Sequence, residues 1–275
     1  MQKSTKILYD SSKRGIPLIE EFKELVRYKD LLQILIINNI KSRYKRSTFG
    51  VVWTMLNPLL YMTVMTIAFS HLLRFEIANY PVYLLTGLIA WNFFSQTTTQ
   101  AMGTLLLSGA LFKRIYIPRA IFAVAAVGSG VINLFLSCIP LLLIMLLTHQ
   151  PLYMTWWFVP ISILILAGIS LGVSLILSMI AIFFADIMDL YQILLQATFY
   201  LTPIMYPETV LPAKIQHYIV LNPIYDVVRV FRNPVYDGHL PSFYALCAAL
   251  ISTFAVLCFG WWFFTRKADQ ISYRV

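Results

Sequence analysis

Charged residues and phosphate-binding loops are scarce in this chain of 275 residues. Only 12% of its residues are charged and 59% are hydrophobic, whereas a soluble domain has about 25% and about 45–50%. So little polar surface cannot cover the core of a water-soluble protein of this size. No Gly-Lys dipeptide occurs, which excludes a Walker A loop. The composition predicts an integral membrane protein that is not itself an ATPase.

Metal-binding and disulfide patterns are also missing. The cysteines Cys138, Cys247 and Cys258 lie in apolar runs, and the four histidines stand singly, without the spacing that zinc needs. The apolar runs contain almost no ionisable residues, which argues against a proton- or sodium-coupled carrier and against catalysis within the bilayer. We therefore expect no metal or cofactor in this chain.

The apolar runs predict the fold class. Crossing about 30 Å of hydrocarbon takes about 20 helical residues, and runs near that length recur along the chain. We predict an all-α integral membrane protein with a cytoplasmic segment over 1–50, a transmembrane domain over 51–264 and a cytoplasmic tail over 265–275. The six predicted spans are Val51 to Leu73, Val82 to Thr104, Ala120 to Leu147, Phe158 to Phe184, Leu190 to Tyr206 and Phe243 to Phe264.

The distribution of basic residues predicts the orientation. With six spans, the segments on the side of both termini hold 17 Lys and Arg, and those on the other side hold 4. Because positive charge favours the cytoplasmic side, we expect both termini there. The net charge of +9 then suits anionic lipid rather than nucleic acid.

Two amphipathic stretches flank the spans. Apolar residues at three- and four-residue steps from Phe22 to Ile40 predict one helix along the cytoplasmic interface; packing of this helix on its own bundle is the alternative. The stretch 207–242, broken by Pro223 and Pro234, predicts short re-entrant helices that cap a cavity, or helices resting flat on the outer interface.

Small residues along the fourth span indicate helix packing, whereas the polar run 95–100 in the second span indicates a hydrated face.

Several short motifs resemble one family. The run Tyr44-x-x-Ser47-x-Phe49-Gly50-x-x-Trp53-x-x-Leu56-x-Pro58, with Gly87-x-x-x-Trp91, Phe94, Lys113, Pro118-Arg119, Thr202-Pro203-Ile204, Tyr206, Leu211-Pro212, Asn222-Pro223 and Phe231-Arg232, resembles the permease subunit of ABC transporters that export polysaccharide. The resemblance extends from about residue 25 to 267. One departure is Ala185, where the family commonly has arginine in a Phe-Phe-Arg-Asp turn.

This resemblance implies a homodimer of six-span subunits in the bacterial cytoplasmic membrane, with two separate ATP-binding cassette subunits that bind ATP and magnesium. The exported substrate would be a lipid-linked polysaccharide such as O-antigen, capsule or teichoic acid precursor. The alternative is a membrane transferase acting on lipid-linked sugars, for which Asp226, Arg229, Arg232 and Asp237 are the candidate residues. A passive channel lacks the ring of charges that would set its selectivity.

Three groups of site residues follow from this interpretation. Leu111, Phe112, Lys113 and Arg114 are expected to dock into the ATPase subunit, or to rest on anionic head groups. Asn222, Pro223, Phe231 and Arg232 are expected to form an outer gate, with Arg232 binding phosphate as a bidentate donor or snorkelling to the interface.

The third group is a substrate path, because sugars offer flat C–H faces and hydroxyl edges that suit aromatic rings and uncharged hydrogen-bonding groups. Trp53 and Tyr206 lie near span ends, where an aromatic belt explains them equally well; Tyr61 and Phe199 lie deeper. The predicted path comprises Trp53, Tyr61, Gln96, Thr99, Phe199, Tyr200 and Tyr206.

Overall fold

The computed structural model describes residues 17–45, 47–72, 77–107, 117–184, 186–219 and 222–267, and within them the chain is helical, without strands. The α-helices are α1 (Pro17–Arg27), α2 (Lys29–Tyr44), α3 (Val52–Leu72), α4 (Tyr80–Leu107), α6 (Ile121–Leu147), α7 (Val159–Phe183), α8 (Ile187–Leu201), α9 (Ala213–Ile219), α10 (Pro223–Arg232) and α11 (Phe243–Lys267). Short turns of other helix types are η1 (Met154–Phe158), η2 (Glu208–Val210) and η3 (Asn233–Asp237).

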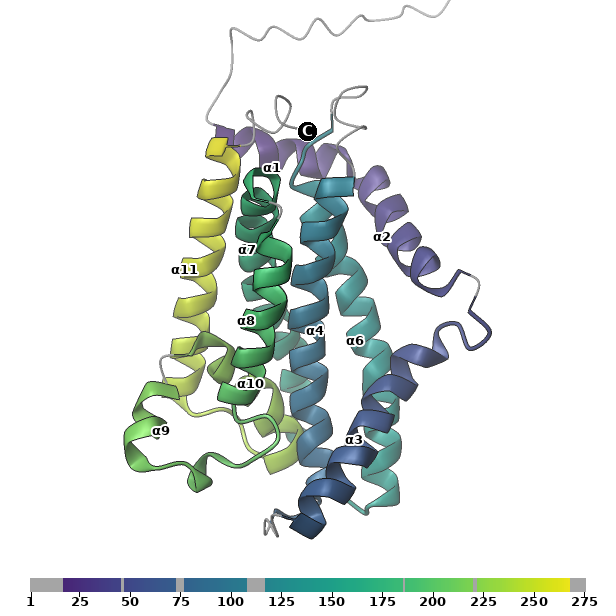
Figure 1. Cartoon of the computed structure of the whole chain (residues 1–275), viewed down its shortest axis with the longest axis vertical. Helices are drawn as coiled ribbons and strands as arrows, with labels where there is room; N and C mark the ends of the chain where they lie inside the picture. Colours follow the sequence, from purple (N-terminus) through teal and green to yellow (C-terminus); the bar gives the residue numbers. More distant parts are fainter. Residues whose placement is uncertain are drawn as a thin grey trace, which may run out of the picture.

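Long helices run side by side along the vertical axis of Figure 1. Helix α4 is central, because it packs against α3, α6, α7, α8 and α10, and its first half from Val82 to Trp91 is buried. Helices α7 and α11 cross closely at Gly172 and Gly260, where a β-carbon on either glycine would overlap the backbone of the other helix. Small residues at such a crossing allow close packing in a membrane.

Three of these segments are long and apolar enough to cross a membrane: Ile121–Leu147, Met154–Phe183 and Phe243–Lys267. The other three predicted spans coincide with α3, α4 and α8. The predicted end of the fifth span at Tyr206 is wrong, since α8 ends at Leu201. Thr202 is extended (φ −90°, ψ 131°), because the proline that follows it disfavours helical backbone.

The N-terminal amphipathic stretch is divided into two helices rather than one. The break falls at Tyr28, between α1 and α2. Helix α1 lies across one end of the bundle (Figure 1), where the Trp261 indole donates to the Leu18 carbonyl at 3.2 Å and Glu21 accepts a hydrogen bond from Ala120 N at 3.1 Å. Helix α2 slopes along α6, and its Ile36 fills the space that Gly128 leaves.

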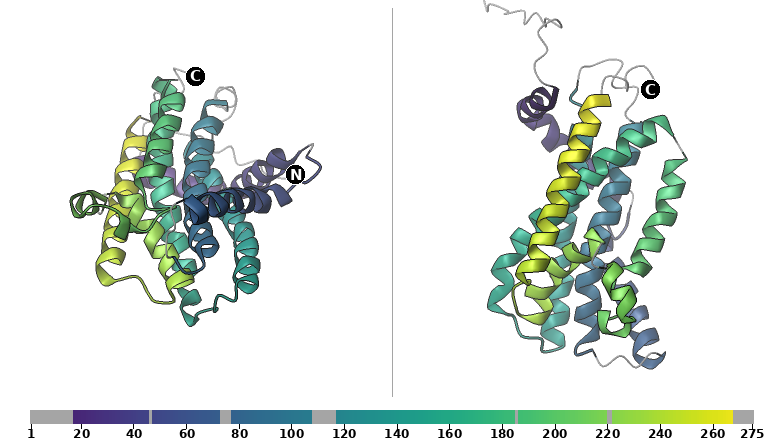
Figure 2. Two further views of the ribbon diagram at one scale, coloured as in Figure 1. Left: turned by 60° about the horizontal axis from the view of Figure 1, so that its bottom comes forward. Right: turned by 90° about the vertical axis from the view of Figure 1, so that its left-hand side faces the viewer.

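At the opposite end, the stretch between α8 and α11 folds into short helices, as expected. Helix α10 is buried against α4, α7 and α11, whereas Tyr218 of α9 is exposed. Both views of Figure 2 show α9 and α10 beside the ends of the long helices.

Candidate functional site

A groove runs along α4 between α2, α3, α6 and α8; we call it the α4 groove. It consists of three adjoining cavities with volumes of about 250, 480 and 550 Å³. Asn57 and Asn92 line both the first and the second cavity, and Ser95 and Gln192 line both the second and the third. The cavities therefore form one continuous groove.

Aromatic rings gather in the second cavity. The Phe199 ring lies 5.5 Å from that of Trp91 and 6.4 Å from that of Tyr61, and it contacts Tyr200 edge-on at 5.5 Å. These rings come from α3, α4 and α8, so the cluster depends on how the three helices pack. Edge-to-face contacts at such distances are favourable.

The remaining walls of the groove carry uncharged hydrogen-bonding groups. Helix α4 presents a polar face, and α8 presents Gln192 and Gln196, one turn apart. Helix α8 is fixed on α4 by a buried hydrogen bond of 2.7 Å between the Thr98 and Tyr191 hydroxyls. Together the polar lining includes Asn57, Asn92, Ser95, Gln96, Thr99, Gln100, Gln192 and Gln196.

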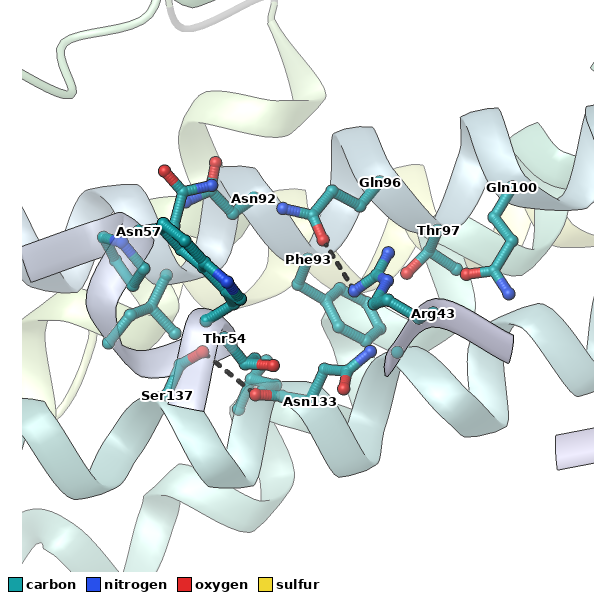
Figure 3. Close-up of a pocket in the computed structure, with 15 residues that line it drawn as sticks. Arg43, Thr54, Asn57, Asn92, Phe93, Gln96, Thr97, Gln100, Asn133 and Ser137 are labelled. Atoms are coloured by element: carbon teal, nitrogen blue, oxygen red, sulfur yellow. Dashed lines mark hydrogen bonds between the residues drawn. The ribbon is translucent and has the colours of Figure 1, made fainter. Parts of the chain in front are cut away.

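The first cavity, shown in Figure 3, has one basic side chain among its described lining residues. Arg43 enters it from α2, and its Nη1 donates to the Gln96 carboxamide oxygen at 3.1 Å. Thr97 and Gln100 of α4 and Asn133 of α6 also line the cavity. We call it the Arg43 cavity.

Next to the groove's aromatic end, the chain from 202 to 206 is non-helical, yet its carbonyl groups have partners. Arg232 donates from Nη1 to the Pro203 carbonyl and from Nη2 to the Ile204 carbonyl, both at 3.0 Å. The hydroxyls of Tyr80 and Tyr83 donate to the next two carbonyls, at 2.8 and 3.0 Å. Irregular backbone inside a membrane bundle requires such partners.

Arg232 is therefore a buried residue, 6% exposed, whose guanidinium also lies 3.9 Å from the centre of the Tyr83 ring. Asn222 caps α10 by accepting from Ile224 N and donates to the Thr202 hydroxyl, each at 3.0 Å. Pro223 occupies the first turn of α10, where its missing N–H is harmless. Phe231 is fully buried in the core.

These features agree with a comparison to known proteins. The model of the ABC-2 type transporter family matches residues 30–236. The chain belongs to the ABC-2 type transporter family. With its apolar helices, this ABC-2 chain is a multi-pass membrane protein.

Named relatives align with most of this ABC-2 chain. The O-antigen export system permease protein RfbA of Klebsiella pneumoniae is 29% identical over 213 residues, which cover 77% of this chain and 82% of the relative. RfbA of Myxococcus xanthus is 28% identical over 229 residues, covering 82% and 87%. The polysialic acid transport protein KpsM of Escherichia coli is 23% identical over 242 residues, covering 84% and 91%.

Most of the predicted path residues of this ABC-2 chain share the α4 groove. Trp53, Tyr61, Gln96, Thr99, Phe199 and Tyr200 line it. Tyr206 is not among the lining residues; its hydroxyl donates to the Tyr200 carbonyl at 2.8 Å. The role of these residues in transport stays a prediction.

Sequence reasoning missed other lining residues as site residues. Trp91 belongs to one motif of the resemblance, and Arg43 directly precedes another. That both residues line the same groove was not evident from the sequence. A stronger signal was available on α8, where Gln192 and Gln196 are four residues apart and so share one helix face. Asn57 likewise lies one turn before Tyr61 on α3.

The predicted outer-gate residues lie together near the end of the bundle opposite α1. A phosphate contact of Arg232 stays a prediction, and both of its terminal nitrogens already donate to carbonyls. Nearby Asp226 is 3% exposed, and its Oδ1 has no hydrogen-bond partner in the part of the chain that the structure describes. Burial raises the pKa of Asp226 to about 6, against the opposing effect of Arg229. Leu111, Phe112, Lys113 and Arg114 lie outside the described residues.

Proposed function

We propose that this chain is the transmembrane permease subunit of an ATP-driven exporter that moves a lipid-linked polysaccharide across the cytoplasmic membrane. The observation that carries the proposal is the α4 groove. Its aromatic rings suit the C–H faces of sugars, and its carboxamides and hydroxyls suit their hydroxyl groups. The names of the relatives, which export O-antigen or transport polysialic acid, agree with this substrate class.

The composition of the groove suits the release of a polymer that must keep moving. Strong charges would hold a ligand tightly, whereas neutral hydrogen bonds contribute only about 0.5–1.5 kcal/mol each. The described residues that line the aromatic cavity are all uncharged. A sugar chain could therefore exchange one set of contacts for the next as it passes Tyr61, Trp91 and Phe199.

The proposed assembly is a homodimer with two ATP-binding cassette subunits, which bind the ATP and magnesium. Exposed apolar side chains flank the α4 groove on α3 and α8, including Leu60, Val64, Ile193 and Leu194. A second copy packed against these helices would close the groove toward lipid. The segment Leu111–Arg114 is proposed to dock on the ATPase, where an apolar pair supplies burial and two cations supply orientation.

The proposed topology has six spans, an interfacial helix before them and both termini in the cytoplasm. In this topology the connections between spans one and two, three and four, and five and six lie on the same side of the membrane. Hydrogen bonds join these three connections in the structure. Gln150 contacts Asn79, and its Nε2 donates to the Tyr236 carbonyl at 3.1 Å. Thr155 donates to the Pro234 carbonyl at 2.7 Å. These contacts support placing the three connections together at the outer end.

The outer gate is proposed to be formed by α10 and the chain from 202 to 206. Helix α10 and this segment are held to each other by Arg232 and Asn222. Since the segment follows α8 directly, a movement of α8 would be transmitted to the gate.

The alternative transferase is not favoured, because the relatives are transport proteins and its candidate Arg232 is buried against carbonyl groups.

A double substitution in the groove tests the proposal. Tyr61→Ala with Phe199→Ala, in cells that carry the matching ATPase and glycan genes, should strongly reduce surface glycan while dimer assembly and basal ATP hydrolysis stay near normal. The matched control is Tyr244→Ala with Phe254→Ala, two exposed aromatic residues of α11 outside the groove. Unchanged surface glycan in the groove variant would contradict the proposed path.

A further inference from the structure

The Arg43 cavity differs from the aromatic cavity in charge, because Arg43 lines it and also the adjoining third cavity, whereas the described residues around the aromatic cavity are uncharged. The lining of the Arg43 cavity contains one cation and, among the described residues, no carboxylate. The other polar groups around it are the hydroxyls and carboxamides of Thr54, Asn57, Asn92, Gln96, Thr97, Gln100, Asn133 and Ser137. A cavity with this lining favours an anion over a cation.

Arg43 is available for a ligand. Its side chain is exposed, and among the described residues its hydrogen bond goes to a neutral carboxamide, that of Gln96. A guanidinium has five N–H donors in a planar fork that matches phosphate oxygens. Figure 3 shows this fork inside the cavity, between residues of α4 and Asn133 of α6.

A second feature, independent of Arg43, points to the same place. Thr97 lines the cavity, is 2% exposed, and its hydroxyl has no hydrogen-bond partner among the described residues. This hydroxyl lies against Gly130 of α6, where a β-carbon would overlap it. Because buried polar groups normally have partners, an unpartnered hydroxyl in a polar cavity suits a bound ligand.

We propose that the Arg43 cavity binds the phosphate ester of a lipid, with Arg43 as the charged donor and Thr97 as a hydroxyl donor. One source of this phosphate is the diphosphate of a lipid-linked glycan, and in naming this source the inference rests on the proposed function. The head group of an anionic phospholipid is the other source with the same chemistry. A bidentate guanidinium contact would account for recognition of either one.

The position of the cavity links this contact to the sugar path. Asn57 and Asn92 line both the Arg43 cavity and the aromatic cavity. A phosphate beside Arg43 therefore leaves its first attached sugar close to the aromatic cluster of Tyr61, Trp91 and Phe199. Recognition of the lipid end and passage of the sugar end would then occupy adjoining parts of one groove.

The test is equilibrium binding to the complete transporter in nanodiscs, without ATP. The probe is a radiolabelled polyprenyl diphosphate carrying one sugar, in discs of phosphatidylcholine. Arg43→Gln should weaken its binding by about tenfold or more, the loss of one charge-assisted contact. Thr97→Val, which keeps the shape, should weaken binding by a smaller factor. Lys41→Gln is the matched control, since it removes a cation from the same helix outside the cavity.

A second arm identifies the source of the phosphate. Native mass spectrometry in phosphatidylglycerol discs counts the anionic lipids that each variant retains. Loss of one phosphatidylglycerol in Arg43→Gln alone, with unchanged polyprenyl diphosphate binding, would assign the cavity to a membrane phospholipid. Equal behaviour of Arg43→Gln and Lys41→Gln toward both probes would overturn the inference. If the two variants behave equally and the wild-type complex exports glycan, the proposed function stands and only the phosphate site is rejected.

Discussion

Gly87 on α4 faces the guanidinium of Arg232 on α10 so closely that a β-carbon on Gly87 would overlap the arginine Nη2. The same guanidinium donates to the carbonyls of Pro203 and Ile204. Three short motifs that are far apart in the sequence thus meet at one buried arginine. The glycine leaves the space, the arginine supplies the donors, and the proline ends α8 where those donors are needed.

Alanine at Gly87 should therefore displace the arginine or the chain that it holds. We expect Gly87→Ala to destabilise the protein by about 1–3 kcal/mol, the range for overpacking. Thermal unfolding of the purified protein in detergent, followed by tryptophan fluorescence, measures this effect. Gly103→Ala is the control on the same helix, because its β-carbon would meet only a Met188 atom at 3.9 Å. Equal melting temperatures for both variants would contradict the close contact.

Lysine at Arg232 tests how the arginine works. A lysine keeps the charge but cannot donate to two carbonyls in a fixed fork, so Arg232→Lys should lower both the melting temperature and glycan export. Arg229→Lys is the matched control, since Arg229 lies 5.2 Å from the centre of the Tyr225 ring on the same helix. Loss of export at an unchanged melting temperature would instead favour direct binding of phosphate by Arg232.

Asp226 should make the stability of the protein depend on pH. Burial raises its pKa from the ordinary 3.8 to about 6, so the folded state holds the proton more tightly than the unfolded chain does. The contribution of the protonated Asp226 to the stability of the folded state is complete below the unfolded pKa and is lost as the pH rises through about 6.

Asp226→Asn should remove this dependence between about pH 3 and 7, an interval that spans the shift from 3.8 to about 6. Melting temperatures across that interval measure it, with the exposed Asp30→Asn on α2 as the control. If Asp226→Asn shows the same dependence of melting temperature on pH as the wild type, other groups set that dependence.

Accessibility of cysteines tests the orientation. In a background without Cys138, Cys247 and Cys258, cysteine at the exposed positions Leu152 and His239 should react with an impermeant thiol reagent added to intact cells. Cysteine at the exposed Lys29, near the opposite end of the bundle, should react only after the membrane is opened. The reverse pattern would contradict cytoplasmic termini.

Much of the fold could be predicted from the sequence, because apolar runs and their lengths reflect a local requirement of the bilayer. Helices α3, α4, α6, α7, α8 and α11 all coincide with predicted spans. The errors arose where one residue overrides the pattern. The extended backbone at Thr202 ends α8 early despite the apolar residues that follow, and the break at Tyr28 divides one predicted helix into two.

The site was harder to predict, because it depends on contacts between helices. Tyr61 and Phe199 were identified from their depth, and they do meet. The position of Arg43 beside Gln96 could not be predicted, because it requires the path of the chain between α2 and α3. Nor does periodicity indicate that Arg232 is buried, since an arginine at a helix end is usually exposed.

The central claim is that the glycan passes along the α4 groove, and photocrosslinking during transport tests it most directly. A benzophenone amino acid would replace Phe199 or Tyr61 in the groove, and Phe254, an exposed residue of α11, in the control. Illumination while the reconstituted complex hydrolyses ATP and exports glycan should yield permease adducts that bind a glycan-specific antibody at both groove positions but not at position 254. Export that continues with no adduct at either groove position would contradict the claim.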